Sequence, residues 1–147
     1  MEAPKKTLII LMADDDSDDR LLAQEAMYES RVLNELHFVE DGVQLLSYLR
    51  GEGFYSDRRL YPMPGLILLD LNMPKMDGRE ALAEIKADTR LRRIPVVILT
   101  TSKAEADMIR GYDLGAASYI TKPVTFDALV ELMRTLGKYW VEFVELP

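Results

Sequence analysis

The sequence predicts an α/β fold in which five parallel strands form one open sheet with helices on both faces. Five short apolar segments alternate along the 147 residues with segments of helical periodicity, and parallel neighbours need the crossover connections that helices provide. Charged or hydroxyl-bearing residues follow four of the five apolar segments. In open α/β sheets, ligands bind at that edge, beyond the carboxyl ends of the strands.

The predicted strands are short and rich in branched apolar residues. Asp70 directly follows the third of them, whose continuous apolar residues indicate burial on both faces. Right-handed crossovers between successive strands then give a doubly wound sheet. We expect the strands at Leu8–Met12, Leu36–Val39, Leu66–Leu69, Pro95–Leu99 and Ser118–Thr121.

Five helices are expected between and after these strands. The first runs from about Asp18 to Glu29, with Asp16 or Ser17 as its N-cap and a two-faced pattern formed by Leu21, Leu22, Glu25, Ala26 and Glu29. The second helix is expected after the Asp41-Gly42 turn, with an apolar stripe of Val43, Leu45, Leu46 and Leu49. The third and fourth are expected at Gly78–Ala87 and Ala104–Tyr112. The fifth is expected after a Thr125 cap, with Ala128, Leu129, Leu132, Met133 and Leu136 on one side.

The connection from Gly51 to Gly65 is much longer than the roughly four to six residues typical of such loops. It is rich in aromatic and proline residues. It is interpreted either as a surface loop packed under its own aromatic side chains or as an insertion that contacts a partner.

The composition indicates one globular domain over residues 1–147. The net charge is −7, which argues against a nucleic-acid surface. The absence of cysteine excludes disulfides and thiolate metal sites. No secretory signal is visible, and no apolar run approaches the roughly 18 residues that span a bilayer. We therefore expect a cytoplasmic protein without a membrane or nucleic-acid partner.

Asp14, Asp15 and Asp70 are expected to bring three carboxylates together at the ligand-binding edge. Two such charges about 4 Å apart repel by roughly 4 kcal/mol at an effective dielectric constant of about 20. The cluster would therefore hold a proton or a cation. A few hard oxygen ligands that leave room for water favour Mg²⁺ over zinc or copper.

Lys122 and Thr100 add an ammonium and a hydroxyl to the same edge. Together with a metal ion they supply what a phosphoryl group needs, because the cations neutralise its oxygens and the hydroxyl donates a hydrogen bond. A carboxylate can itself be the nucleophile, and Asp70 is the natural candidate. Each feature alone is common as a turn or a helix cap; their coincidence at corresponding strand ends favours a site.

The motifs resemble the receiver domains of two-component response regulators over nearly the whole chain. That resemblance implies a flavodoxin-like sheet with strand order 2-1-3-4-5. The residues that carry it are Asp14-Asp15 after the first strand, Asp70 in the segment from Leu68 to Gly78, Thr100 after the fourth apolar segment, and Tyr119 to Lys122-Pro123.

The resemblance also implies a role for each residue. Asp70 would accept a phosphoryl group from a phosphohistidine on a sensor kinase. Asp15 would bind Mg²⁺ directly and Asp14 largely through water, with Asp70 and the backbone carbonyl of Asn72 completing the metal site. The residues expected to contact or report the phosphoryl group are Lys122, Thr100, the Thr101 amide and the switch aromatic Tyr119.

Three details qualify these assignments. Asp16 makes the choice of the acidic pair ambiguous from spacing alone. Asn72 and Ser102 occupy the positions that tune dephosphorylation in the family, so the phosphoryl lifetime is left open. The family's bond before the proline is typically cis, and we therefore expect a cis Lys122-Pro123 bond.

No effector domain is visible after the receiver motifs, so a stand-alone receiver that signals by docking is expected. The long connection and the aromatic ending resemble the small response regulators that pair with bacterial phytochrome kinases. Leu136, Trp140, Phe143 and Val144 fall at helical spacing in an extension from about residue 137. They pack either within the chain or, as we slightly favour, in a homodimer that also uses the fourth helix, fifth strand and fifth helix.

Three functions compete on the sequence: a phosphorylatable switch, a metal-dependent aspartate-nucleophile phosphatase, and a receiver that binds partners without phosphorylation. Such phosphatases typically carry a second acid two residues after the nucleophile, where this chain has Asn72. Binding-only receivers usually lack a key residue. The switch is therefore favoured, with no enzymatic activity beyond phosphoryl transfer to itself and slow self-dephosphorylation.

Overall fold

The computed structural model describes residues 8–30, 34–71, 73, 75–100, 115–123 and 125–142. Its five strands form one sheet of order β2-β1-β3-β4-β5, and all four pairings are parallel. The predicted doubly wound sheet is confirmed, with strand ends within two residues of those expected. The strands are β1 (Leu8–Ala13), β2 (Asn34–Val39), β3 (Leu66–Asp70), β4 (Val96–Thr100) and β5 (Ser118–Thr121).

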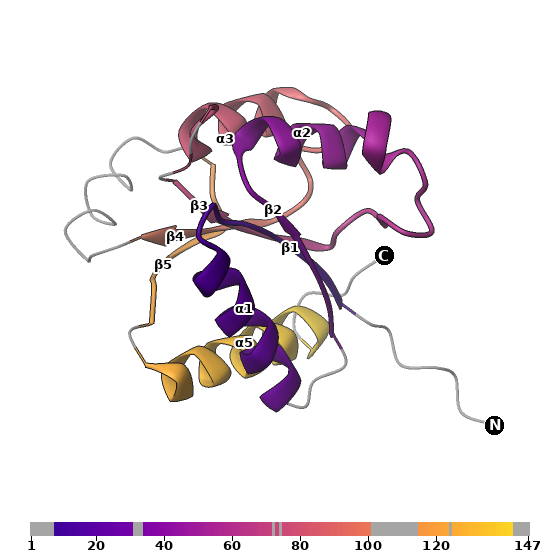
Figure 1. The fold of residues 1–147 in the computed structure, drawn as a ribbon. Helices are drawn as coiled ribbons and strands as arrows, with labels where there is room; N and C mark the ends of the chain where they lie inside the picture. The colour runs from indigo at the N-terminus through magenta and orange to yellow at the C-terminus, as the bar shows by residue number, and fades with distance from the viewer. Residues whose placement is uncertain are drawn as a thin grey trace.

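Helices cover both faces of the sheet (Figure 1). Helices α2 and α3 lie on one face, and α1 and α5 lie on the other (Figure 1). The described helices are α1 (Ser17–Glu29), α2 (Gly42–Arg50), the 3-10 helix η1 (Gly53–Tyr55), α3 (Gly78–Ala87) and α5 (Phe126–Glu142). The expected fourth helix at Ala104–Tyr112 lies outside the described residues.

The core has two halves, one on each side of the sheet. Strands β3 and β4 are buried along their whole length, and successive side chains alternate between the two halves. In β3, Ile67 and Leu69 join the half that α2 and α3 cover, while Leu66 and Leu68 join the half that α1 and α5 cover. The sheet is thereby fixed between two apolar layers, which holds its carboxyl-end edge in place.

Helix α1 packs on the sheet through small side chains rather than through its leucines. Ala23 and Ala26 are fully buried and Met27 is nearly so, whereas Leu21 and Leu22 are 56% and 44% exposed. The two alanines allow the helix backbone to approach the sheet closely. The predicted pattern is therefore right for Ala26 and wrong for Leu21 and Leu22.

The predicted apolar stripes of α2 and α5 each contain one position that is exposed in the structure. Val43 is 48% exposed, whereas Tyr48 is buried and its hydroxyl donates to the Pro62 carbonyl at 2.9 Å. Ala128 is exposed, while Val130 is buried. The expected Thr125 cap is confirmed by a 3.1 Å hydrogen bond from the amide of Ala128 to its hydroxyl.

The long connection folds back on α2. Its aromatic rings form a cluster with Tyr48, in which Tyr55 and Tyr61 lie 5.2 and 5.9 Å from the Tyr48 ring. Phe54 joins this cluster but remains 77% exposed. The interpretation as a loop packed under its own aromatic side chains is therefore confirmed, and the partner contact stays a prediction.

Arg58 ties the same connection to the carboxyl end of α2. Its guanidinium donates to the carbonyls of Tyr48 and Leu49 at 2.7 Å each and to that of Tyr61 at 3.1 Å. The last carbonyls of a helix have no partner within the helix, so a side chain that satisfies them stabilises the helix end.

We expect Arg58→Met to lower the free energy of unfolding by about 2 kcal/mol, because it leaves partly buried carbonyls without their charged donor. Arg59→Met is the matched control, since the Arg59 side chain is 92% exposed. Urea unfolding followed by circular dichroism measures both variants. Equal midpoints for the two variants would contradict the proposed role of Arg58 as a helix cap.

In the described part of the chain, no helix combines the length and the apolar character needed to cross a membrane.

Candidate phosphoryl-acceptor and metal site

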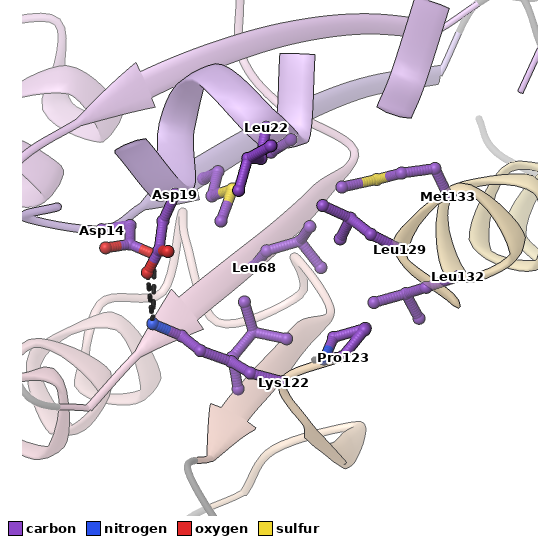
Figure 2. A pocket seen from close by; sticks show the side chains of 12 residues that line it. Asp14, Asp19, Leu22, Leu68, Lys122, Pro123, Leu129, Leu132 and Met133 are labelled. Atoms are coloured by element: carbon purple, nitrogen blue, oxygen red, sulfur yellow. Dashed lines mark hydrogen bonds and ion pairs between the residues drawn. The ribbon is translucent and has the colours of Figure 1, made fainter. Parts of the chain in front are cut away.

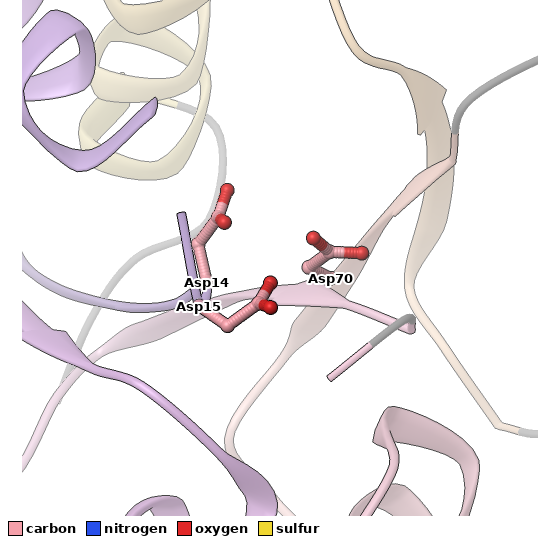
Figure 3. A group of neighbouring side chains, drawn as sticks. All are labelled: Asp14, Asp15 and Asp70. Carbon is pink, nitrogen blue, oxygen red and sulfur yellow. The ribbon is translucent and has the colours of Figure 1, made fainter. Parts of the chain in front are cut away.

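The sheet register brings the predicted acids together. Ala13 of β1 pairs with Leu69 of β3, so the residues that follow them, Asp14 and Asp70, lie side by side at the carboxyl-end edge. Asp14, Asp15 and Asp70 each offer a carboxylate oxygen within 4.8 Å of the other two. Figure 3 shows the three side chains turned toward a common space.

The chain after β1 fixes which two acids accompany Asp70. The amide of Asp14 donates to the Val39 carbonyl at 3.0 Å, and this residue is fully buried. Asp16 instead caps α1, where its carboxylate accepts from the amides of Asp18 and Asp19. The ambiguity left by the sequence is therefore resolved: Asp16 holds the helix, and Asp14 and Asp15 face Asp70.

Lys122 closes the other side of the site. Its amide donates to the Thr100 carbonyl at 2.7 Å, which positions the residue directly after β5. Its ammonium contacts the carboxylates of Asp70 at 2.9 Å, Asp19 at 3.1 Å and Asp14 at 3.2 Å. The contact with Asp70 places a cation beside the predicted nucleophile.

Among the described residues of the site, Asp19 is the one that the sequence did not identify. On the sequence, an acid in the first turn of a helix is adequately explained by the helix dipole. The structural reason lies in the short connection between β1 and α1, because a helix that begins at Ser17 presents its first turn to the strand ends. The short connection after Asp14 was the feature of the sequence from which the position of Asp19 at the site could have been predicted.

Burial and charge act against each other in this cluster. Burial raises the pKa of Asp14 to about 6, although the hydrogen bond from the Asp16 amide and the charge of Lys122 act in the opposite direction. Burial also disfavours the charge of Lys122, but its hydrogen bond with Asp70 and the charges of Asp70 and Asp14 raise its pKa above the ordinary value. Lys122 is thus cationic at neutral pH.

The other predicted residues are distributed around this centre. Thr100 is fully buried at the end of β4, and its hydroxyl lies 3.5 Å from the Ile120 carbonyl. Tyr119 is partly buried and packs against the core on the α2 and α3 side of the sheet. Asn72 and Thr101 lie outside the described residues.

The bond between Lys122 and Pro123 is trans, so the expected cis bond was wrong. The trans form is favoured by about 0.5–1 kcal/mol even before proline. Here the trans chain already places the Lys122 amide on Thr100 and its ammonium on the acids.

Gly78 allows α3 to begin directly against the end of β3. A Cβ atom at this position would lie 2.7 Å from the Asp70 carbonyl oxygen and 2.7 Å from the Leu71 Cα. The Gly78 amide also donates to the Leu71 carbonyl at 3.0 Å. The close approach holds the backbone that carries Asp70.

The donor set suits a divalent cation. Three carboxylates around one space, one of them exposed, offer hard oxygen ligands and leave positions for water. Lys122 offsets part of their charge but lies to one side, bonded to Asp14 and Asp70. The residues present therefore fit a divalent metal ion held by Asp14, Asp15 and Asp70.

The chain is similar to known proteins over nearly its whole length. Residues 10–134 match the family of the response regulator receiver domain. The chain is 42% identical over 139 residues to response regulator Rcp1 of Synechocystis sp., covering 95% of this chain and 92% of that protein.

Two solved structures are also similar over nearly the full length. The phosphorylated cyanobacterial phytochrome response regulator RcpA is 43% identical with a TM-score of 0.83, covering 97% of this chain and 99% of that one. The Mn²⁺-bound form of Rcp1 is 42% identical with a TM-score of 0.78, covering 98% and 99%.

Proposed function

The chain belongs to the response regulator receiver family, and we propose that Asp70 accepts a phosphoryl group from the phosphohistidine of a sensor kinase. The observation that carries this proposal is the ammonium of Lys122, 2.9 Å from the buried Asp70 carboxylate and beside the three-acid cluster. That arrangement combines a nucleophile, a cation for the phosphoryl oxygens and a metal-binding set.

In the proposed reaction, a carboxylate oxygen of Asp70 forms a bond to phosphorus as the bond between phosphorus and the kinase histidine nitrogen breaks. The electron pair of the broken bond stays on the imidazole. Lys122 donates hydrogen bonds to the phosphoryl oxygens and offsets their negative charge. The product is the modified chain itself, so the reaction is a single transfer rather than turnover of a substrate.

A divalent metal is part of the proposal, and we assign it as Mg²⁺. Asp15 and Asp70 would bind it directly, Asp14 largely through water, and the Asn72 backbone carbonyl would contribute as the family resemblance implies. When bound, the ion supplies positive charge to the phosphoryl oxygens. The Mn²⁺-bound form of Rcp1, 42% identical, supports a divalent ion at this site.

Signalling is proposed to run through Thr100 and Tyr119. The Thr100 hydroxyl and the Thr101 amide would bond the phosphoryl group, and Tyr119 would turn inward into the space that Thr100 leaves. Thr100 and Tyr119 lie on adjacent strands, whose register pairs Thr100 with Thr121 and Ile98 with Tyr119. This proximity supports direct coupling between the two side chains.

The proposed partner is a phytochrome-type sensor kinase in the cytoplasm. The similar protein RcpA is a cyanobacterial phytochrome response regulator, which supports this choice of kinase. The single histidine of the chain, His37, pairs with Glu35 on β2 at 2.8 Å. We propose that the phosphohistidine belongs to the sensor kinase.

Incubation with acetyl phosphate and Mg²⁺, followed by intact mass measurement, tests the proposal. We expect the wild-type chain to gain one phosphoryl group and Asp70→Asn to gain none. No gain in the wild-type chain would support a receiver that binds partners without phosphorylation. Rapid multiple turnover of acetyl phosphate would support a phosphatase.

We further propose a homodimer formed through the fourth helix, β5, α5 and the extension from about residue 137 of this single receiver domain. β5 is an edge strand with partly exposed residues, which supports an interface there. Leu136, however, is only 6% exposed and packs in the core, so an apolar stripe available to a partner would begin after it.

Gel filtration of the chain and of a variant truncated before Tyr139 tests this interface. We expect the full chain to elute as a dimer and the truncated chain as a monomer. A truncated chain that remains a dimer would contradict the role of the extension.

A further inference from the structure

We propose that Asp19 is a positioning residue that holds Lys122 in the resting protein and gives it up when a phosphoryl group arrives on Asp70. This inference rests on the proposed phosphorylation of Asp70. It concerns the one side chain in the cluster that neither the sequence motifs nor the metal site accounts for. It makes α1 a part of the phosphorylation site.

The ammonium of Lys122 has no donor to spare in the resting structure. An ammonium carries three N–H donors, and carboxylates of three residues lie at hydrogen-bond distance: Asp70 at 2.9 Å, Asp19 at 3.1 Å and Asp14 at 3.2 Å. Phosphorylated Asp70 keeps one carboxyl oxygen and adds three phosphoryl oxygens beside Lys122, so the acceptors around the ammonium then outnumber its three donors and one existing contact gives way.

Burial decides which carboxylate withdraws. Asp70 carries the phosphoryl group and stays beside Lys122, whereas the Asp14 side chain is 0% exposed and would lose its partner in a place that water reaches poorly. The Asp19 side chain is 39% exposed. Water can replace Lys122 at Asp19 with little loss, whereas a buried acceptor left unsatisfied carries the full desolvation penalty.

The surroundings also leave room for the exchange. Asp19 and Lys122 lie at one end of a cavity of about 70 Å³, whose remaining lining is mainly apolar and includes Leu22, Leu129 and Met133 (Figure 2). Both side chains therefore border unfilled space. Asp19 belongs to the first turn of α1, which Asp16 holds in place independently.

The Asp19 carboxylate competes with the incoming phosphoryl group for the N–H donors of Lys122, and this competition slows the phosphorylation of Asp70. Replacing the Asp19 carboxylate with an uncharged amide weakens its hold on one N–H of Lys122, because a neutral amide oxygen is a weaker acceptor than a carboxylate. Since one exposed hydrogen bond to a charged group is at stake, we expect Asp19→Asn to be phosphorylated by acetyl phosphate roughly fivefold faster than the wild type at saturating Mg²⁺.

Asp18→Asn is the matched control. It removes the same charge from the adjacent position in the same helical turn, and no ion pair joins Asp18 to Lys122 among the described residues. Asp19→Glu restores a carboxylate and is expected to return the rate toward the wild-type value. Stopped reactions analysed by intact mass give the rates, and calorimetric titration gives the Mg²⁺ affinity of each variant.

The proposal is supported if Asp19→Asn reacts at least about threefold faster than Asp18→Asn at matched metal saturation, a difference of about 0.65 kcal/mol. It is overturned if the two variants react at the same rate or if Asp19→Asn is slower. A wild-type chain that gains no phosphoryl group would instead reject the proposed function itself. Melting temperatures of the three variants show whether any difference reflects folding.

Discussion

Replacing Lys122 with methionine is expected to reduce phosphorylation by acetyl phosphate on the order of 100-fold, the usual cost of losing one preorganised donor to a developing negative charge. The same change should destabilise the metal-free protein. Lys122 is the shared partner of Asp14 and Asp70, both almost fully buried. Removing one member of a buried charged group costs about 3 kcal/mol, somewhat less here because the Lys122 side chain is 24% exposed.

The destabilisation of Lys122→Met should depend on pH in a defined direction. The pKa of Asp14 is about 6 in the fold against an ordinary value of 3.8, so the fold favours its protonated form. The stability contributed by that proton is fully present below pH 3.8 and is lost as the pH rises to about 6. Without Lys122 the ionised Asp14 carboxylate is destabilised further. The free energy of unfolding that Lys122→Met loses should therefore be larger at pH 7 than at pH 4.

Urea unfolding at the two pH values, with and without Mg²⁺, measures these effects. Mg²⁺ should restore more stability to Lys122→Met than to the wild type, since it replaces the missing cation. Lys75→Met is the control, because the Lys75 side chain is 69% exposed and lies 3.7 Å from its acidic partner Asp41. A Lys122→Met loss that is equal at both pH values would contradict the electrostatic account.

Asp15→Asn is expected to separate metal binding from folding. Asp15 is exposed, in contrast to Asp14 and Asp70, so its replacement should change the free energy of unfolding by less than about 0.5 kcal/mol. The loss of a direct ligand should nevertheless weaken Mg²⁺ binding by at least the roughly 10- to 100-fold that the loss of a residue supporting a ligand typically costs. Phosphorylation at limiting Mg²⁺ should fall in proportion and recover at high Mg²⁺.

Calorimetric titration with Mg²⁺ and the rise of melting temperature with Mg²⁺ concentration check this expectation. Asp18→Asn again controls for the loss of one negative charge near the site. If Asp15→Asn and Asp18→Asn bound Mg²⁺ with the same affinity, Asp15 would not be a ligand. Chelation of divalent ions should abolish phosphorylation of the wild-type chain.

The sequence predicted the centre of the site because parallel strands align their ends. Asp14, Asp70, Thr100 and Lys122 each lie within two residues of the end of a predicted strand, and the register of the sheet brings these strand ends together. Residue types at strand ends were therefore sufficient to locate them. No knowledge of side-chain packing was needed.

Features that depend on how helices meet the sheet were harder to predict. Leu21 and Leu22 are exposed because alanines bring α1 close to the sheet, a choice that helical periodicity does not reveal. Asp19 reaches Lys122 because α1 starts at Ser17. The isomer of the bond before Pro123 depends on a free-energy difference of about 0.5–1 kcal/mol, which a motif does not determine.

The central claim is that Asp70, and no other acid of the cluster, receives the phosphoryl group. Borohydride reduces an aspartyl phosphate to homoserine, so reduction after treatment with acetyl phosphate and Mg²⁺ marks the acceptor, and peptide mass spectrometry locates it. The structure predicts homoserine at position 70, where the carboxylate lies 2.9 Å from the Lys122 ammonium. Homoserine at Asp14, Asp15 or Asp19 with an unmodified Asp70 would contradict it.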